Sequence, residues 1–322
     1  MTDLLGSFDS LSSPIERLPT RSDLVRVQFR EPLTDDDYAR LAEWLKANPD
    51  VTLRAYGTSG SPLENLDFLR WFPGLTRLSI DLPGLTDLRP LEQVAESLTY
   101  LNLDYTAARV DLTHIPARNL RGLRLVKHEL GLGSLLGSNQ SLRSVALWNY
   151  SAADRVVAHL PVRSLETLAI TNGSIKETSA LGELEGLRLL VLRGVRGFGK
   201  LDFLSRLEKL EWLWVESLKF EALPSLRGHE SLVRVDLDSV STLNPDMIAA
   251  VSEAPALIEV VVTSAKLKPP DFEPLARHAT LAAARIGLSS IRRFEEAARL
   301  LAKRAPSTYW DFAKSRALDL AI

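Results

Sequence analysis

Apolar residues recur along most of the chain in one frame, L-x-x-L-x-L, in which the first, fourth and sixth positions are apolar. Alternation over the later positions predicts a short strand in each frame. The rest of each unit has room only for a short return segment, so we expect the units to stack and share one core. The frames begin at Leu75, Leu98, Leu120, Leu142, Leu165, Leu187, Leu210, Leu232, Leu257 and Leu281, at steps of 22 to 25 residues.

This repeat resembles that of leucine-rich repeat proteins, specifically the short 22-residue class of internalin-like bacterial proteins. The resemblance covers residues 75–287. It implies an α/β fold: a right-handed solenoid with a curved parallel sheet on its concave face and short helical or irregular return segments. The family usually has Asn or Cys at the ninth position of the repeat, but here residues such as Pro83, Thr106 and His128 stand there. The return segments must therefore satisfy their backbone polar groups in another way.

The N-terminal part predicts a β-α-β cap over residues 21–74, preceded by a flexible tail over residues 1–20. Leu24–Phe29 alternates like a strand, and Thr34 precedes a helical pattern with three aspartates in its first turn. A hydroxyl N-cap and acidic residues both favour the start of a helix. A second strand is expected at Val51–Tyr56.

The C-terminal part, residues 288–322, predicts a helical cap. Residues 291–305 form an amphipathic pattern, and the segment after them is expected to add a second helix. Both helices are expected to cover the last strand, because a solenoid must shield its terminal core layer. A dimer contact through Tyr309, Trp310 and Phe312 is the alternative.

Composition and charge narrow the class of protein. The 322 residues carry a formal net charge of -2, which provides no attraction for nucleic acid or an anionic membrane. Cysteine is absent, so disulfides and thiolate catalysis are excluded. No stretch approaches the roughly 20 apolar residues of a membrane helix, and the N-terminus lacks the pattern of a secretory signal. We expect a cytoplasmic protein.

No motif supports an enzyme. The segment from Gly194 to Leu201 matches the glycines and lysine of a phosphate-binding loop, but Leu201 replaces the Ser or Thr that would hold magnesium. The five histidines are widely spaced and show no metal-ligand pattern. We therefore expect no catalytic residues, no cofactor and no metal site.

The candidate site lies on the face opposite the core, where the third, fifth and seventh positions of each frame point. Trp148, Trp212 and Trp214 fall on this face, and we expect them to form an exposed aromatic patch with acidic residues at its rim. The candidate partner-binding residues are Trp148, Leu189, Val191, Arg193, Trp212, Trp214, Glu216, Arg234, Asp236 and Asp238.

These patterns predict a non-enzymatic scaffold that binds another protein through the aromatic patch on the concave face. A glycan or peptide receptor is one alternative. Coverage of the patch by the chain's own tail, or by a second copy in a homodimer, is another. A catalytic site in the concave cleft has the least support. The chain is expected to be a monomer or a homodimer.

Overall fold

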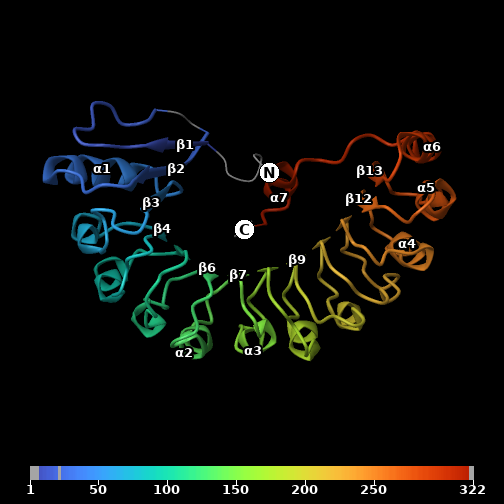
Figure 1. The fold of residues 1–322 in the computed structure, drawn as a ribbon, viewed down its shortest axis with the longest axis horizontal. Helices are drawn as coiled ribbons and strands as arrows, with labels where there is room; N and C mark the ends of the chain where they lie inside the picture. Colours follow the sequence, from blue (N-terminus) through green and yellow to red (C-terminus); the bar gives the residue numbers. More distant parts are fainter. Residues whose placement is uncertain (1–6, 21–22, 319–322) are drawn as a thin grey trace. The chain divides into compact units, whose positions relative to one another are not determined.

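In the computed structural model, which describes residues 7–20 and 23–318, the strands follow one another in a parallel sheet in the order of the sequence (Figure 1). One compact unit ends at Ala146 and a second begins at Leu147. The strands are β1 (Ser7–Ser10), β2 (Leu24–Phe29), β3 (Thr52–Tyr56), β4 (Arg77–Asp81), β5 (Tyr100–Leu103), β6 (Gly122–Val126), β7 (Ser144–Trp148), β8 (Thr167–Thr171), β9 (Leu189–Arg193), β10 (Trp212–Glu216), β11 (Arg234–Asp238), β12 (Glu259–Ser264) and β13 (Ala283–Leu288).

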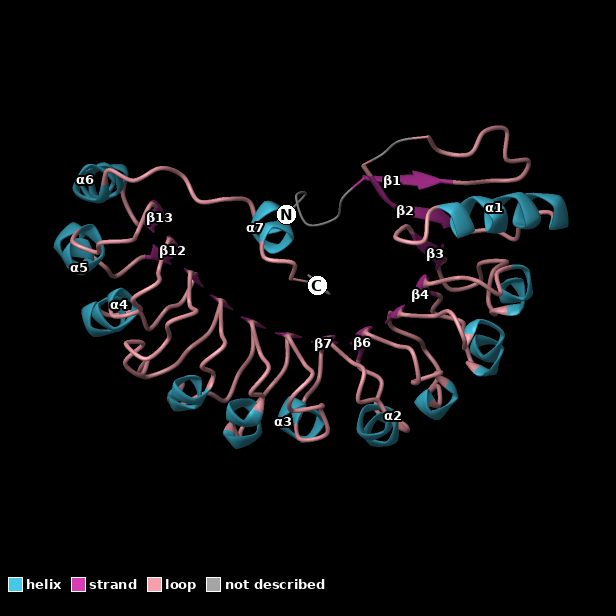
Figure 2. Ribbon diagram, turned by 180° about the vertical axis from the view of Figure 1, so that it is seen from behind, coloured by secondary structure: helices cyan, strands magenta, loops and turns pink. Residues whose placement is uncertain are grey.

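Short helices lie in most return segments, and two more, α6 and α7, follow the last strand. The α-helices are α1 (Asp35–Ala47), α2 (Leu132–Ser138), α3 (Ala153–Val157), α4 (Pro245–Ser252), α5 (Glu273–Ala276), α6 (Ile291–Leu301) and α7 (Tyr309–Ser315). The 3-10 helices are η2 (Asp67–Trp71), η3 (Arg89–Val94), η4 (Leu112–His114), η5 (Ser179–Glu183), η6 (Asp202–Arg206) and η7 (Pro269–Phe272). Figure 2 shows these helices separated from the strands by loops on either side.

Each of the ten sequence frames contains one strand, from β4 to β13, which confirms the predicted repeat. The leucines at the first position are all buried, at most 4% exposed. In β10, Leu213 and Val215 occupy the fourth and sixth positions and are also buried in the core. The third, fifth and seventh positions point to the opposite side of the sheet, which we call the open face.

The chain leaves the sheet through a left-handed residue at the eighth position of six successive frames. Glycine and asparagine adopt this conformation at the least cost. The six residues are Lys127, Asn149, Asn172, Gly194, Ser217 and Ser239. The backbone N–H of Asn172 donates to the Arg193 carbonyl, and that of Gly194 to the Glu216 carbonyl, at 2.8 and 2.9 Å. Backbone pairing between neighbouring repeats thus continues past the strands without the family's asparagine.

Histidines satisfy carbonyls in the return segments. His128 Nε2 lies 2.8 Å from the carbonyl oxygen of Asp104, and His229 Nε2 lies 2.8 Å from that of Leu204. His278 makes the same kind of contact at 2.9 Å. Burial lowers the pKa of His128, which favours its neutral form. These histidines link neighbouring repeats.

The N-terminal segment differs from the prediction of a flexible tail, although residues 1–6 lie outside the described part. Strand β1 pairs in parallel with β2, and Ile15 is buried. The Asp37 carboxylate accepts from the Ile15 N–H at 3.0 Å and from the Ser13 hydroxyl at 2.7 Å. Thr34 caps α1 by accepting from the Asp37 N–H. The segment is therefore fixed to α1 by a buried carboxylate.

The two C-terminal helices have different places in the second unit. Helix α6 packs against β13 and η7, as expected of an end cap. Helix α7 does not cover the last strand. It lies on the open face, on the other side of the strands from α4 and α5 (Figure 1). The prediction that both helices cover the last strand is wrong for α7, because Tyr309 and Phe312 pack against the two tryptophans of β10.

Candidate binding site on the open face

Two tryptophans of β10 form the centre of the site. Trp212 and Trp214 occupy the third and fifth positions of one strand, so both side chains stand on the open face. Their rings are parallel, with an interplanar angle of 3° and centroids 5.7 Å apart. Trp212 is 0% exposed and Trp214 is 1% exposed. The expectation of an exposed aromatic patch is therefore wrong, and the reason is the helix that covers it.

Helix α7 covers the tryptophans with two aromatic residues of its own. Thr308 caps the helix by accepting from the Asp311 N–H at 3.1 Å. Tyr309 and Phe312 are three positions apart, so they lie on one helix face. The Tyr309 ring stacks on Trp214 with centroids 4.1 Å apart, and the Phe312 ring meets Trp212 edge-on at 5.0 Å. Tyr309 and Phe312, which the alternative of a dimer contact had named with Trp310, thus make an intramolecular contact.

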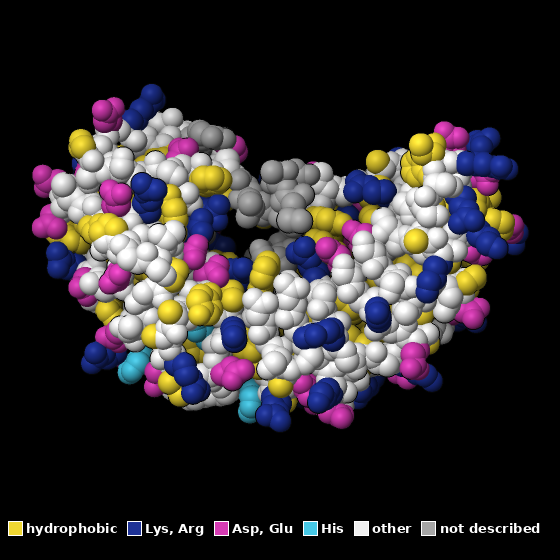
Figure 3. Space-filling model, viewed as in Figure 1, with side chains coloured by type: hydrophobic (Ala, Val, Ile, Leu, Met, Phe, Trp, Pro, Cys, Tyr) yellow, Lys and Arg dark blue, Asp and Glu magenta, His cyan; other side chains and the backbone are white. Residues whose placement is uncertain are grey.

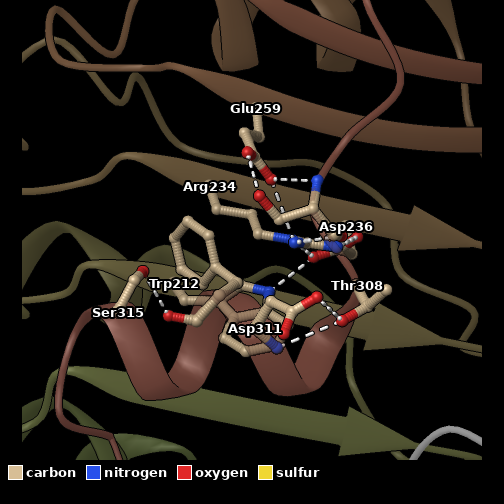
Figure 4. A network of polar contacts seen from close by, with 9 residues as sticks. Trp212, Arg234, Asp236, Glu259, Thr308, Asp311 and Ser315 are labelled. Atoms are coloured by element: carbon tan, nitrogen blue, oxygen red, sulfur yellow. Dashed lines mark hydrogen bonds and ion pairs between the residues drawn. The ribbon is translucent and has the colours of Figure 1, made fainter.

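A buried ionic network lies beside the tryptophans on β11 and β12. Arg234 Nε donates to Asp236 at 2.8 Å, and Arg234 Nη1 donates to Glu259 at 3.1 Å. The Trp212 indole N–H also donates to Asp236. The Arg234 guanidinium lies 5.0 Å from the centroid of the Phe312 ring. Figure 4 shows these side chains gathered next to α7.

Asp236 was expected at an exposed rim, and that expectation is wrong because the carboxylate is completely buried. Burial raises its pKa, while Arg234 and the Trp212 N–H oppose that shift by favouring the charged form. Burial also raises the pKa of Tyr309 to about 12, and the nearby Asp236 charge adds to this shift. The phenol of Tyr309 therefore stays neutral throughout the physiological range.

The sheet also holds the backbone at both ends of α7. Before the helix, the Ser307 N–H and hydroxyl donate to the Glu259 carboxylate at 3.0 and 2.7 Å. The Ser307 carbonyl accepts from Arg234 Nη1 at 3.0 Å. After the helix, the Arg316 carbonyl accepts from Arg188 Nη2 at 2.7 Å. The two carbonyls and the Ser307 N–H are main-chain groups that any peptide in this position would offer, whereas the Ser307 hydroxyl belongs to this segment's own side chain.

The remaining residues of the predicted site lie around the tryptophans. Leu189 and Val191 on β9 are fully buried. Their register places Leu189 beside Trp212 and Val191 beside Trp214. Arg193 forms an ion pair with Glu216 at 2.9 Å and lies over the Trp214 ring at 5.3 Å. The structure therefore brings these β9 and β10 residues together.

Two predicted residues lie further from α7. Trp148, at the end of β7, is only half-buried. Asp238, at the end of β11, accepts from the hydroxyls of Thr263 and Ser239. The site as built centres on β9, β10 and β11, with Glu259 of β12 at its edge.

The predicted site left out Ser307, Glu259 and Arg188, and it named Tyr309 and Phe312 only in the alternative of a dimer contact. The signal in the C-terminal segment was a Ser-Thr pair followed by aromatic residues three positions apart, which describes a capped helix with one aromatic face. The signal on the sheet was an arginine and an aspartate on neighbouring open-face positions of β11. Neither pattern predicts which surface of the protein the helix packs against.

We also looked for metal-ligand groups and membrane-spanning helices in the described part of the chain. Within residues 7–20 and 23–318, no group of three or more His, Asp or Glu side chains is arranged to hold a metal ion. No helix in that part of the chain is both long and apolar enough to cross a bilayer. Over the face seen in Figure 3, Lys and Arg side chains are interspersed with Asp and Glu.

Two surface hollows lie away from the tryptophans, with volumes of about 750 and about 380 Å³. The larger is lined by Val162, Gly182, Glu183, Glu185, Ser205, Arg206, Glu208 and Lys209. The smaller is lined by Tyr105, Thr106, Ala107, Ala108, Arg109, Val110, Val126, Lys127, His128, Glu129 and Leu130. Both belong to the return side of the repeats and include no residue of the predicted site.

One solved structure shares this architecture over most of the chain. The internalin InlF from Listeria monocytogenes aligns over 85% of this chain and 76% of its own, with a TM-score of 0.52 and 15% identity. The chain has a leucine-rich repeat fold. Internalin C2 from Listeria monocytogenes aligns over 75% of this chain and 83% of its own, with 18% identity and a TM-score of 0.36.

A leucine-rich repeat protein from Leptospira interrogans aligns over 88% of this chain and 89% of its own, with 14% identity and a TM-score of 0.38. No protein-family model matches the sequence, and no curated protein matches it. At 15% identity the likeness to InlF establishes the fold of the chain, and its function must be argued from its own residues.

Proposed function

We propose that this leucine-rich repeat chain is a non-enzymatic scaffold that binds another protein on the open face of β9, β10 and β11. Helix α7 occupies this face as an intramolecular ligand, and a helical segment of the partner replaces it. The observation that carries the proposal is the docking of Tyr309 and Phe312 on Trp212 and Trp214. Aromatic anchors at the centre with charges around them are typical of protein interfaces.

The contacts define the chemistry of the partner. It presents a short helix with aromatic residues at positions i and i+3. A hydroxyl residue before the helix satisfies Glu259, and main-chain carbonyls satisfy Arg234 and Arg188. The site recognises a helix face together with the two ends of its backbone.

When α7 is docked, one buried hydrogen-bond donor of the sheet has no acceptor, and this favours replacement of α7 by a partner segment that supplies one. The indole N–H of Trp214 is buried and has no hydrogen-bond partner among the described residues. A buried donor without an acceptor costs about 1–3 kcal/mol. A partner segment that places an oxygen near this N–H binds more tightly than α7. Helix α7 is also only seven residues long, too short to be stable without its docking surface.

The test uses the full chain and a fluorescent peptide with the sequence of residues 305–318. In the variant Tyr309→Ala/Phe312→Ala the chain's own helix loses its anchors, so the peptide should bind and its anisotropy should rise. The wild-type chain, whose site is occupied, should bind the peptide at least tenfold more weakly. Adding Trp214→Ala to the double variant should abolish binding.

Trp310→Ala is the matched control, because Trp310 belongs to the same helix but is exposed, at 42%. This variant should exclude the peptide as the wild type does. The proposal is overturned if the double variant stays folded by circular dichroism and fails to bind the peptide. It is also overturned if the triple variant binds as well as the double variant.

A further inference from the structure

The open face of the first unit carries three arginines on neighbouring strands. Arg26 on β2, Arg54 on β3 and Arg77 on β4 all point to this face. The strand register aligns Arg26 with Thr52, and Arg54 lies two residues further along β3, beside Gln28. Ser79 of β4 lies beside Arg54, so Arg77 stands in the same row as Arg26. Three guanidinium groups therefore share a small area.

In the part of the chain that the structure describes, one of the three arginines has a carboxylate partner. Arg54 forms an ion pair with Asp81, and its Nη1 donates to the Gln28 amide oxygen at 3.1 Å. Arg26 and Arg77 have no carboxylate partner among the residues that the structure describes. The described part of the cluster therefore has an excess of two positive charges.

Aromatic rings hold the two unpaired guanidiniums in place. The Arg26 guanidinium lies 5.0 Å from the centroid of the Phe8 ring, and that of Arg77 lies 4.4 Å from the centroid of Tyr100. Arg77 Nε makes one weak contact, at 3.4 Å, with the Thr52 hydroxyl. A guanidinium stacked on a ring keeps its N–H edge available for a planar acceptor.

The environment makes an anion favourable here. Arg26 is only partly exposed, and burial together with the Arg54 charge lowers its pKa. A half-buried cation beside a like charge gains more from a carboxylate than an exposed cation does. Elsewhere on the open face of this unit, Arg124 has the Asp104 carboxylate at 3.4 Å. Within residues 7–20 and 23–318, neither Arg26 nor Arg77 has such a neighbour.

We propose that Arg26 and Arg77 bind an acidic peptide segment, each arginine holding one carboxylate. The two residues stand in one row two strands apart, which separates their backbones by about 10 Å. An extended peptide rises about 3.3 Å per residue, so carboxylates two or three residues apart span this distance. Each guanidinium forms the paired N–H···O contacts that match a carboxylate. The surface lies in the first unit and does not depend on the function proposed for α7.

The test measures binding of fluorescent hexaglutamate to the full chain by anisotropy at low salt. Wild type should bind it, and hexaglutamine should not bind. Arg26→Gln/Arg77→Gln should weaken hexaglutamate binding at least tenfold. Arg26→Lys/Arg77→Lys keeps the charge and loses the planar fork, so its affinity should fall between the two. Urea denaturation checks that each variant remains folded.

Arg109→Gln/Arg118→Gln is the matched control, because it removes the same charge from exposed return-segment positions of the same unit. It should bind hexaglutamate as the wild type does. Equal weakening in both glutamine pairs would show a net-charge effect and overturn the proposal. Pyrophosphate or a single-stranded oligonucleotide that competes as well as hexaglutamate, charge for charge, would overturn the assignment to an acidic peptide.

Discussion

The open faces of the two units differ although the same frame builds both. In the first unit the face of β3 to β5 carries Arg54, Arg77 and Asn102, and these side chains are partly exposed. In the second unit the face of β10 and β11 carries tryptophans and an ionic network that are buried under α7. The frame fixes the core positions only. The positions that point away from the core are free to carry different chemistry in each region.

The largest contrast is expected between the ion pairs of the two faces. Asp236→Ala leaves Arg234 and the Trp212 N–H buried with one acceptor fewer, which should cost about 3–5 kcal/mol of unfolding free energy. Asp81→Ala removes the partner of Arg54 from a face where both side chains keep about a quarter of their exposure, 24% and 28%. It should cost about 1 kcal/mol or less. Urea denaturation measures both.

The two values together test the comparison. Equal losses for Asp236→Ala and Asp81→Ala would mean that the second face is as hydrated as the first, and α7 would then not cover it in solution. Asp236→Asn is a useful companion, because it keeps the shape and one acceptor. Its loss should lie between that of the alanine variant and zero.

Detaching α7 should make the second face resemble the first. Phe312→Ala removes a buried ring from the Trp212 edge and should lower the unfolding free energy by about 2–4 kcal/mol, less than in a deep core because the helix can release. The tryptophan emission maximum should move to longer wavelength as water reaches Trp212. Trp310→Ala should change stability by less than about 0.5 kcal/mol. Similar effects of the two substitutions would contradict the docked position of α7.

Alkaline pH should weaken the second unit through Tyr309. Its pKa of about 12 in the folded chain lies above the ordinary value of 10.0. The stability from the neutral phenol is fully present below pH 10 and is lost as the pH rises toward 12. Wild type should therefore lose more unfolding free energy between pH 9 and pH 11 than Tyr309→Phe does. Parallel pH profiles for the two proteins would show that Tyr309 is exposed.

The smallest effects are expected where the two units are alike. Lys127 in the first unit and Ser217 in the second both adopt left-handed backbone, with φ of 60° and 56°. Glycine at either position relieves strain but adds unfolded-state entropy, so each substitution should stabilise by about 0.5 kcal/mol. Thermal denaturation should give similar shifts at the two positions. Clearly different shifts in melting temperature would mean that the two units differ at these turns as well as on their open faces.

The apolar frame was enough to predict the strands, the buried first-position leucines and the stacking of the repeats. Each of these depends on residues a few positions apart, and the alternation at Leu213 and Val215 settles which side is core. The same alternation placed Trp212 and Trp214 correctly on the open face. It could not indicate their exposure, because the covering residues stand about 100 positions later in the chain.

The sequence by itself determined the repeat, its core and the direction of each side chain, since these follow from local spacing. Only the tertiary structure decided what lies on the open faces. Tyr309 and Phe312 reach Trp214 and Trp212 through a long connection whose path no local pattern specifies. Apolar burial is not directional, so an aromatic helix docks wherever the folded chain offers enough apolar surface and partners for its polar groups.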